Sequence, residues 1–254
     1  KNSGPNFSRN RAEEIIPKTC KYVIPIDSDD TFYNYKTLEM MVKDIKNSKE
    51  NIGIIAYSSI DGITGNRVSF TQKPEIEIDF IESLKGEKFK GEFLFIQKRE
   101  VLKFSKWPEK IWGYEGIRHW EINKSSDFLY KETIGRIYYR DRKENLTSPE
   151  GTILRANSMV DGINYLLKKH GDKLKFYNRD RYIYFNFTKS VYLLLSNKKF
   201  EFLKHSIFLL KLRKNFKMNV LCLFLFLFII FPNSFNKKMY LFIKKAWRQI
   251  KILQ

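Results

Sequence analysis

The sequence predicts an α/β fold, because helix-like and strand-like segments alternate along its first 148 residues. Apolar residues recur at helical spacing between residues 35 and 47, whereas residues 20–26 and 51–58 are short runs rich in β-branched and aromatic residues. Such alternation is typical of a sheet covered by helices. With 43% hydrophobic and 16% aromatic residues among 254, the chain can build a core, which excludes disorder for most of it.

The expected elements follow in a simple order. A helix is predicted from Arg9 to Ile16 with Ser8 as its N-cap, followed by a buried strand over 20–26. A helix over 35–47 and a strand over 51–58 come next, and turns at 61–62 and 64–66 lead to strands over 92–97 and 133–140. A short helical piece from Glu100 separates these last two strands.

The net charge of +19 is concentrated in the C-terminal part of the chain. Residues 1–148 carry 26 Lys and Arg against 23 Asp and Glu, whereas residues 149–254 carry 21 against 5. We therefore expect a nearly neutral α/β domain over 1–148 and a basic, mostly helical region over 149–254. A nucleic-acid partner is not expected, because the excess of basic residues lies in the tail and not on the folded module.

The tail has the pattern of a membrane-surface segment. Residues 219–231 form an uncharged run that is too short to cross a bilayer, and basic amphipathic helices are predicted over 200–216 and 239–253. We expect peripheral attachment to an anionic membrane surface at the cytoplasmic face. The alternative is that the run is a buried element of the fold and the lysines are its solvated rim.

An acidic cluster follows the first predicted strand. Asp27, Asp29 and Asp30 lie where that strand ends, and ligands of open α/β sheets bind beyond the carboxyl ends of the strands. Carboxylates at close range suit Mn²⁺ or Mg²⁺ shared with a phosphate-bearing substrate. Aspartates in such a cluster also serve as turn and capping residues, so the motif leaves both roles open.

Two families share this local pattern. Residues 27–31, DSDDT, match the D-x-D-x-T motif of haloacid-dehalogenase-like phosphatases, in which Asp27 would be the nucleophile. That family also needs a later acidic metal motif, and Gly171-Asp172 is not followed by the expected second acid. The phosphatase is therefore the alternative function, together with a non-catalytic membrane-surface binding module.

The longer match covers residues 2–148. The run SGPNFSRNRAEEIIPKTCKYVIPIDSDDTFY resembles the central segment of inverting family 2 glycosyltransferases of the GT-A fold, and ETIGRIYYRDRKENLTS is similar to a later stretch of bacterial members. The resemblance implies a GT-A-like mixed sheet flanked by helices, and transfer of a sugar from a nucleotide-sugar, expected to be a UDP-sugar, to a glycan or lipid-linked acceptor. It also implies that the nucleotide-binding strands precede Lys1, so we expect this domain to be partial.

The resemblance assigns roles to residues near the acidic cluster. Arg9, Asn10 and Asp27 would bind the donor, and Asp29 with Asp27 and Asp30 would hold Mn²⁺ or Mg²⁺. The catalytic base is not fixed, because the usual Asp is replaced in the segment WGYEGIRHWEIN. His119, Glu121 and Glu115 are the candidates, and Glu115 would face His119 one helical turn later.

Overall fold

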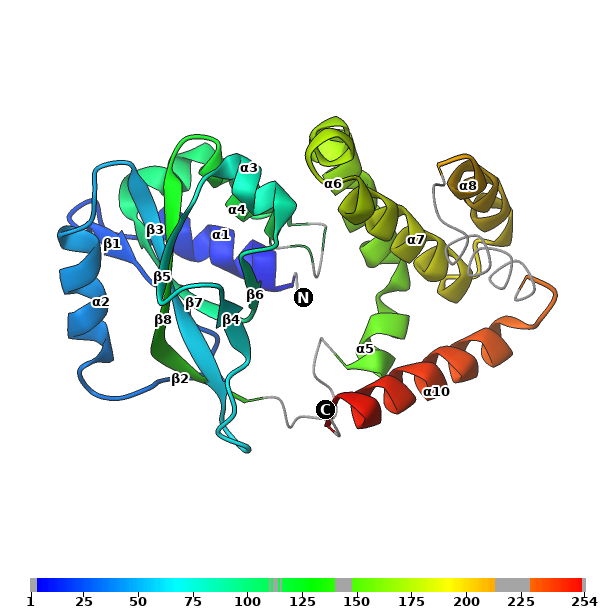
Figure 1. Cartoon of the computed structure of the whole chain (residues 1–254), viewed down its shortest axis with the longest axis horizontal. Helices are drawn as coiled ribbons and strands as arrows, with labels where there is room; N and C mark the ends of the chain where they lie inside the picture. Colours follow the sequence, from blue (N-terminus) through cyan, green and yellow to red (C-terminus); the bar gives the residue numbers. More distant parts are fainter. Residues whose placement is uncertain are drawn as a thin grey trace. The chain divides into compact units, whose positions relative to one another are not determined.

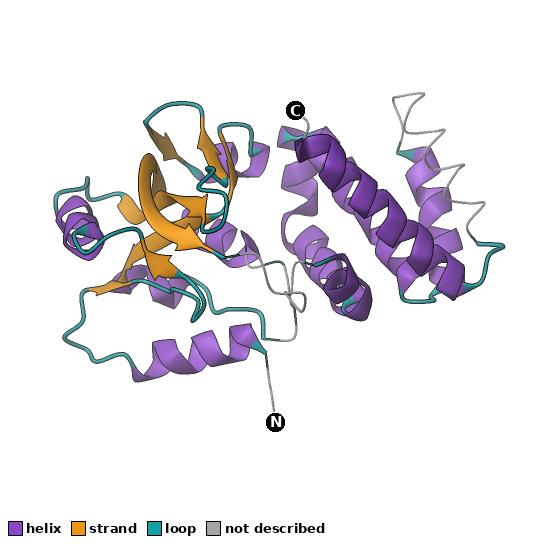
Figure 2. Cartoon of the chain, turned by 90° about the horizontal axis from the view of Figure 1, so that it is seen from below, coloured by secondary structure: helices purple, strands orange, loops and turns teal. Residues whose placement is uncertain are grey.

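The computed structural model describes residues 4–109, 111, 114, 116–139, 148–212 and 229–252, with backbone only for 244–252. These residues form two compact units. The N-terminal unit contains the described residues of 4–109 and 116–139, and the C-terminal unit contains the rest. Figure 2 shows that the strands belong to the first unit and that the second is built of helices. The fold is thus mixed α/β with an additional helical part.

A six-stranded mixed sheet organises the N-terminal unit. Its main path runs in the order β1 (Tyr22–Val23), β7 (Phe93–Lys98), β3 (Ile52–Asp61), β8 (Asp127–Tyr138) and β2 (Thr31–Phe32), and β5 (Glu75–Ile78) also pairs with β8. A separate two-stranded sheet pairs β4 (Ser69–Thr71) with β6 (Phe89–Gly91). Strand β3 is parallel to β8 and antiparallel to β7, and β7 is antiparallel to β1. Hence β1, β3 and β8 run in the same direction, and their carboxyl ends lie at one edge.

Helices cover both faces of this sheet, as Figure 1 shows. On one face, Met41 and Ile45 of α2 (Thr37–Lys46) pack with buried residues of β3 and β7. On the other face, Ile122 of α4 (Gly116–Asn123) and Val101 of the 3₁₀ helix η1 (Arg99–Phe104) join a second core cluster. The short helix α3 (Phe80–Lys85) is preceded by its N-cap Asp79, whose carboxylate accepts a hydrogen bond from the backbone N–H of Glu82. Strand β3 is buried along most of its length, which explains its continuous apolar sequence.

Helix α1 (Pro5–Ile15) begins earlier than the sequence indicates. The prediction of Ser8 as the N-cap is wrong: Ser8 lies inside the helix, and its hydroxyl donates a hydrogen bond to the carbonyl oxygen of Gly4. Gly4 is the residue before the helix, and its positive φ of 89° is a conformation that glycine adopts readily. Pro5 then occupies the first helical position, where its missing N–H costs nothing.

The C-terminal unit consists of helices α5 (Pro149–Leu154), α6 (Ala156–Tyr177), α7 (Arg179–Leu195), α8 (Lys199–Lys211) and α10 (Asn233–Ile252). Its interior includes a cluster of Val160, Leu193, Leu194 and Phe202, against which Ile229 and Met239 pack. In the described parts of the chain, no helix is both long enough and apolar enough to cross a membrane. The predicted uncharged run over 219–231 lies outside the described residues except for its last three.

Candidate functional site

The acidic cluster forms a turn that links the two outer strands of the main path of the sheet. The chain leaves β1, passes through residues 27–30, where the N–H of Asp30 donates to the carbonyl oxygen of Asp27 at 3.0 Å, and enters β2 beside β8. The turn therefore reaches the carboxyl end of β8, and the backbone N–H of Tyr139 donates to Asp30 at 3.4 Å. This is the edge where β1, β3 and β8 end, as the sequence predicts for a ligand site in an α/β sheet.

The three carboxylates of this turn have different surroundings. Asp27 is exposed and forms an ion pair with Arg9 of α1, with 2.8 Å between Arg9 Nη2 and Asp27 Oδ1. Asp30 is buried and bound to Arg136 of β8 at 2.7 Å. Asp29 is half-buried, and within the described part of the chain its carboxylate makes no hydrogen bond or ion pair.

Asp30 is anchored inward rather than offered to solvent. Burial raises the pKa of its carboxyl, and the Arg136 guanidinium opposes that shift. Arg136 also donates to the Ser59 hydroxyl of β3, so one arginine joins the turn to two strands. Among the described residues, no group of three or more His, Cys, Asp or Glu side chains is placed to hold a metal ion. The prediction that Asp27, Asp29 and Asp30 hold Mn²⁺ or Mg²⁺ stays a prediction.

Two of the residues predicted to bind the donor lie on α1, Arg9 half-buried and Asn10 buried. Arg9 lies over the Trp107 ring, 4.8 Å from its centre, while it pairs with Asp27. The Asn10 amide is committed to the segment around Trp107: its Nδ2 donates to the Trp107 carbonyl and to Glu109, and its Oδ1 accepts from the Trp107 N–H. Asn10 therefore fixes α1 to the segment around Trp107. The guanidinium group of Arg9 instead contacts the acidic turn through Asp27.

His119 on α4 is enclosed by aromatic rings. Its ring centre lies 4.4 Å from that of Phe95, 5.9 Å from Phe128 and 6.0 Å from Trp107. Its Nε2 is buried, and no described residue forms a hydrogen bond with it. Loss of solvation, together with the nearby positive charges of Arg118 and Arg9, lowers the His119 pKa to about 3. A ring that holds a proton so weakly is a poor general base at neutral pH.

Glu121 and Glu115 are the other two candidate bases. Glu121, also on α4, keeps 15% of its side chain exposed and pairs with Lys124 at 2.8 Å. Glu115 lies outside the described residues, so its predicted pairing with His119 remains a prediction. Of the two described candidates, His119 is enclosed, whereas the Glu121 carboxylate is partly exposed to solvent.

A buried arginine that the sequence analysis missed stands at the centre of this region. Arg118 is fully buried, binds Glu13 of α1 at 2.8 Å and Gln97 of β7 at 3.1 Å, and lies over the Trp107 ring. Glu13 also accepts a hydrogen bond from the Trp107 indole at 2.8 Å. This network joins α1 to α4 and β7. Glu13 is 105 positions from Arg118 and 94 from Trp107, so no local motif reveals the network.

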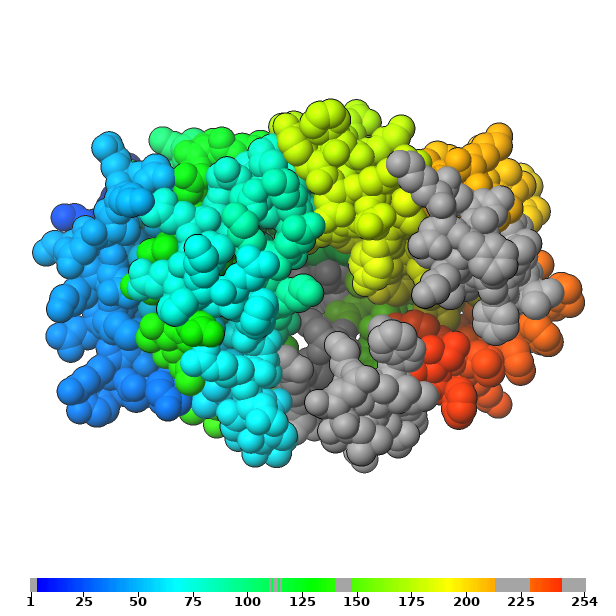
Figure 3. All heavy atoms as spheres, viewed as in Figure 1, coloured from blue at the N-terminus to red at the C-terminus, as the bar shows by residue number. Residues whose placement is uncertain are grey.

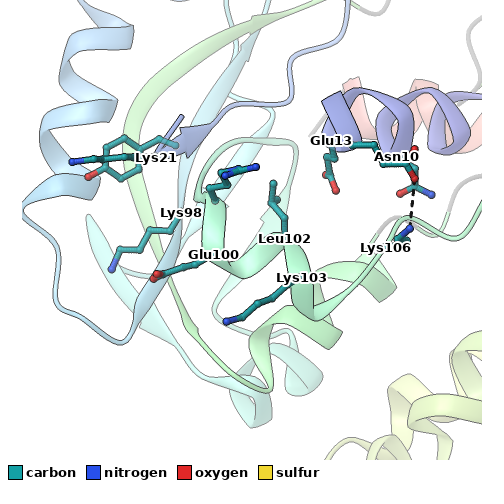
Figure 4. A pocket seen from close by; sticks show the side chains of 11 residues that line it. Asn10, Glu13, Lys21, Lys98, Glu100, Leu102, Lys103 and Lys106 are labelled. Atoms are coloured by element: carbon teal, nitrogen blue, oxygen red, sulfur yellow. Dashed lines mark ion pairs between the residues drawn. The ribbon is translucent and has the colours of Figure 1, made fainter. Parts of the chain in front are cut away.

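A cavity of about 710 Å³ opens beside β1, between α1 and η1, as Figure 4 shows. Of the predicted site residues that the structure describes, only Asn10 lines it. Several of its basic side chains already have partners: Lys106 pairs with Glu14 at 3.5 Å, and Arg99 donates to the carbonyl oxygens of residues 16 and 18. The cavity is therefore distinct from the acidic turn.

No protein-family model matches the chain, and no curated protein matches its sequence.

Proposed function

We propose that this chain carries the metal-binding and acceptor-binding side of an inverting family 2 glycosyltransferase. It would move a sugar from a nucleotide-sugar, expected to be a UDP-sugar, to a hydroxyl group of a surface glycan or lipid-linked acceptor. The observation that carries the proposal is the position of the acidic turn at the edge where β1, β3 and β8 end. Asp30 is anchored there by Arg136, and Asp29 makes no ion pair or hydrogen bond with the residues that the structure describes. That edge is the usual ligand side of such sheets.

The diphosphate leaving group gains negative charge as its bond to the sugar breaks, and the reaction needs this charge to be offset. Mn²⁺ or Mg²⁺, when bound, would neutralise that charge. Asp29 is the carboxylate best placed to hold the ion, and Asp27 would join it by exchanging its contact with Arg9. Arg9 would then be free to pair with a phosphate oxygen, which guanidinium groups bind well. In this proposal Asp30 holds the turn in place through Arg136 and is not itself a ligand.

The acceptor hydroxyl must lose its proton as the new glycosidic bond forms. We favour one of the two candidate carboxylates, Glu121 or Glu115, for this role, because the His119 pKa is lowered to about 3 in an enclosed position. Glu121 is partly exposed, but it lies on the part of α4 beside the start of β8, whereas the acidic turn meets the carboxyl end of that strand. The acceptor oxygen attacks the anomeric carbon while the bond to the diphosphate oxygen breaks. The proton goes to the carboxylate that acts as the base, and the nucleoside diphosphate leaves with the electron pair of the broken bond.

Binding of Mn²⁺ and donor turnover test the proposal separately. We expect the full chain to bind Mn²⁺, observed by electron paramagnetic resonance, and to release UDP from UDP-glucose, UDP-galactose or UDP-N-acetylglucosamine. Asp29→Asn should weaken Mn²⁺ binding at least about tenfold, because it removes a charged oxygen ligand. Asp172→Asn is the matched control, since Asp172 is exposed on α6 in the other unit.

Two outcomes would count against the proposal. Equal Mn²⁺ affinity for both variants would remove the assigned role of Asp29. Release of phosphate from p-nitrophenyl phosphate that is abolished by Asp27→Asn, without any turnover of UDP-sugars, would instead support the haloacid-dehalogenase-like alternative.

A further inference from the structure

The C-terminal unit presents a group of large apolar side chains to solvent where α8 and α10 begin. Phe200 is 81% exposed and Ile230 77% exposed, and Phe231 and Phe235 are also exposed. We call these four residues the phenylalanine corner. Figure 3 shows atoms of α8 and of the start of α10, coloured gold and orange, at the molecular surface. Large apolar side chains gathered in this way on a surface mark an interaction site.

The corner is held in place by the folded interior beneath it. The Lys199 ammonium donates to the carbonyl oxygens of Ile229 and Phe231 at 2.9 and 3.0 Å, which fixes the start of α8 beside the segment that precedes α10. The rings of Phe231 and Phe235 stack with their centres 4.5 Å apart. Ile229 points the other way, into the cluster of Leu193 and Phe202. The same segment thus contributes one residue to the core and the next two to the surface.

The charges around the corner have predominantly one sign. Residues 198–212 and 229–243 contain six lysines and a single acidic residue, Glu201. Lys204 and Lys238 are exposed on α8 and α10, respectively. An apolar group rimmed by lysines matches the boundary of an anionic bilayer, where apolar side chains enter the acyl region and ammonium groups remain among the headgroups.

We propose that the phenylalanine corner docks on an anionic lipid surface and inserts Phe200, Ile230 and Phe231 into its outer acyl region. A protein groove would also accept apolar side chains. The excess of lysine over acidic residues favours a negatively charged partner, and aromatic and branched apolar side chains provide the insertion. The proposal goes beyond the proposed sugar transfer, because lipid binding needs neither donor nor acceptor.

Co-sedimentation of the full chain with vesicles tests this surface. We expect binding to vesicles of 30% phosphatidylglycerol in phosphatidylcholine, and much weaker binding to phosphatidylcholine alone. Phe200→Ser should lower the partition coefficient about tenfold, and Phe200→Ser with Ile230→Ser about one hundredfold, because each exchange removes one inserted apolar side chain. Phe176→Ser is the matched control: Phe176 is equally exposed, at 81%, but lies at the end of α6. It should bind like the unchanged protein.

Insertion can be separated from a loss of folding. Phe200→Trp keeps the corner aromatic, and its added fluorescence should be quenched by brominated phosphatidylglycerol, whereas that of Phe176→Trp should not. Equal quenching of both, or equal vesicle binding by Phe200→Ser and Phe176→Ser, would overturn the proposed surface. Binding to lipid-free protein partners with no vesicle binding would overturn the lipid assignment and support a protein groove. UDP-sugar turnover plays no part in these assays, so their failure leaves the enzymatic proposal unaffected.

Discussion

The two units of this chain use their charged residues in opposite ways. In the N-terminal unit, two arginines are buried in ion pairs with carboxylates: Arg118 with Glu13 and Arg136 with Asp30. In the C-terminal unit the cations far outnumber the acids, and α8 and α10 carry exposed lysines such as Lys204 and Lys238 as well as exposed apolar side chains. A balanced composition therefore gives internal networks that position a site, whereas an unbalanced one gives a surface suited to an anionic partner.

The largest expected effect tests the internal networks. Arg136→Met should lower the free energy of unfolding by about 3–5 kcal/mol, because it leaves the Asp30 carboxylate buried without its partner. Urea unfolding followed by circular dichroism measures the loss. Arg11→Met is the matched control, since Arg11 forms an exposed pair with Glu14 and should cost less than about 1 kcal/mol.

A double variant sharpens this test. Asp30→Leu combined with Arg136→Met removes both charges and should recover much of the lost stability. A single Arg136→Met variant that costs no more than Arg11→Met would contradict the view that this buried pair fixes the acidic turn.

The second prediction compares one histidine from each unit. Burial lowers the pKa of His119 to about 3 and that of His205 to about 4, from an ordinary value of 6.5. Since the folded state disfavours the protonated ring, each histidine's contribution to stability is present above pH 6.5. It is lost as the pH falls toward the folded-state pKa, at about 1.4 kcal/mol per pH unit. At pH 5 each should cost about 2 kcal/mol.

Single substitutions can isolate these two contributions. His119→Phe and His205→Gln should each flatten the dependence of unfolding free energy on pH between 6.5 and 5. His205 has the carbonyl oxygen of Asn186 as a partner at 3.0 Å and Lys189 as a nearby positive charge, whereas His119 has Arg118 and Arg9 nearby. An unchanged slope in His119→Phe would show that its ring is solvated and would restore it as a candidate base.

The third prediction concerns salt. Raising NaCl from 50 to 500 mM should weaken vesicle binding about tenfold or more, because the lysines around the phenylalanine corner act over distances that salt screens. The same change should alter the unfolding free energy of the N-terminal unit little, since its principal ion pairs are buried. Vesicle binding that is insensitive to salt would indicate that the apolar side chains alone drive attachment.

The smallest expected effect should be equal in the two units. Asp79 caps α3 in one unit and Asn178 caps α7 in the other, and each side chain accepts a hydrogen bond from a backbone N–H three residues later. Asp79→Ala and Asn178→Ala should each cost about 1 kcal/mol in urea unfolding. Capping is local, so a large difference between them would mean that the tertiary surroundings contribute to one of the caps.

Much of the fold could be predicted from local sequence patterns. The expected helix over 35–47 is confirmed as α2, and the strands over 51–58 and 92–97 are confirmed as β3 and β7 with shifted ends. The helix over 200–216 appears as α8, and that over 239–253 lies within the longer α10. These elements bury or expose a regular set of side chains, so their period is visible in the sequence.

Other elements depend on partners distant in the chain. The strand predicted over 20–26 is reduced to β1, because only Tyr22 and Val23 pair with β7. The two residues of β2 form a strand only because β8 lies beside them. Strand β8 begins at Asp127, six residues before the predicted strand, since its first half pairs with β3 and β5.

The candidate site shows the same division between local and distant information. The sequence identifies Asp27, Asp29 and Asp30 as a cluster after a strand, since that depends only on neighbours in the chain. It does not separate their roles, because Arg9 and Arg136, which bind Asp27 and Asp30, come from another helix and another strand. Likewise, the motif around His119 says nothing of the aromatic rings that desolvate it.

By itself, the sequence determined the α/β class, the acidic turn after the first strand and the concentration of positive charge in the tail. Each of these follows from residue type and spacing along a short stretch. Only the tertiary structure decided that Asp29 is the carboxylate of the turn with no ion pair among the described residues, that His119 is enclosed and that Phe200, Ile230 and Phe231 are exposed. The physical reason is that pairing, desolvation and exposure depend on which distant residues approach a side chain, and those distances are set by packing.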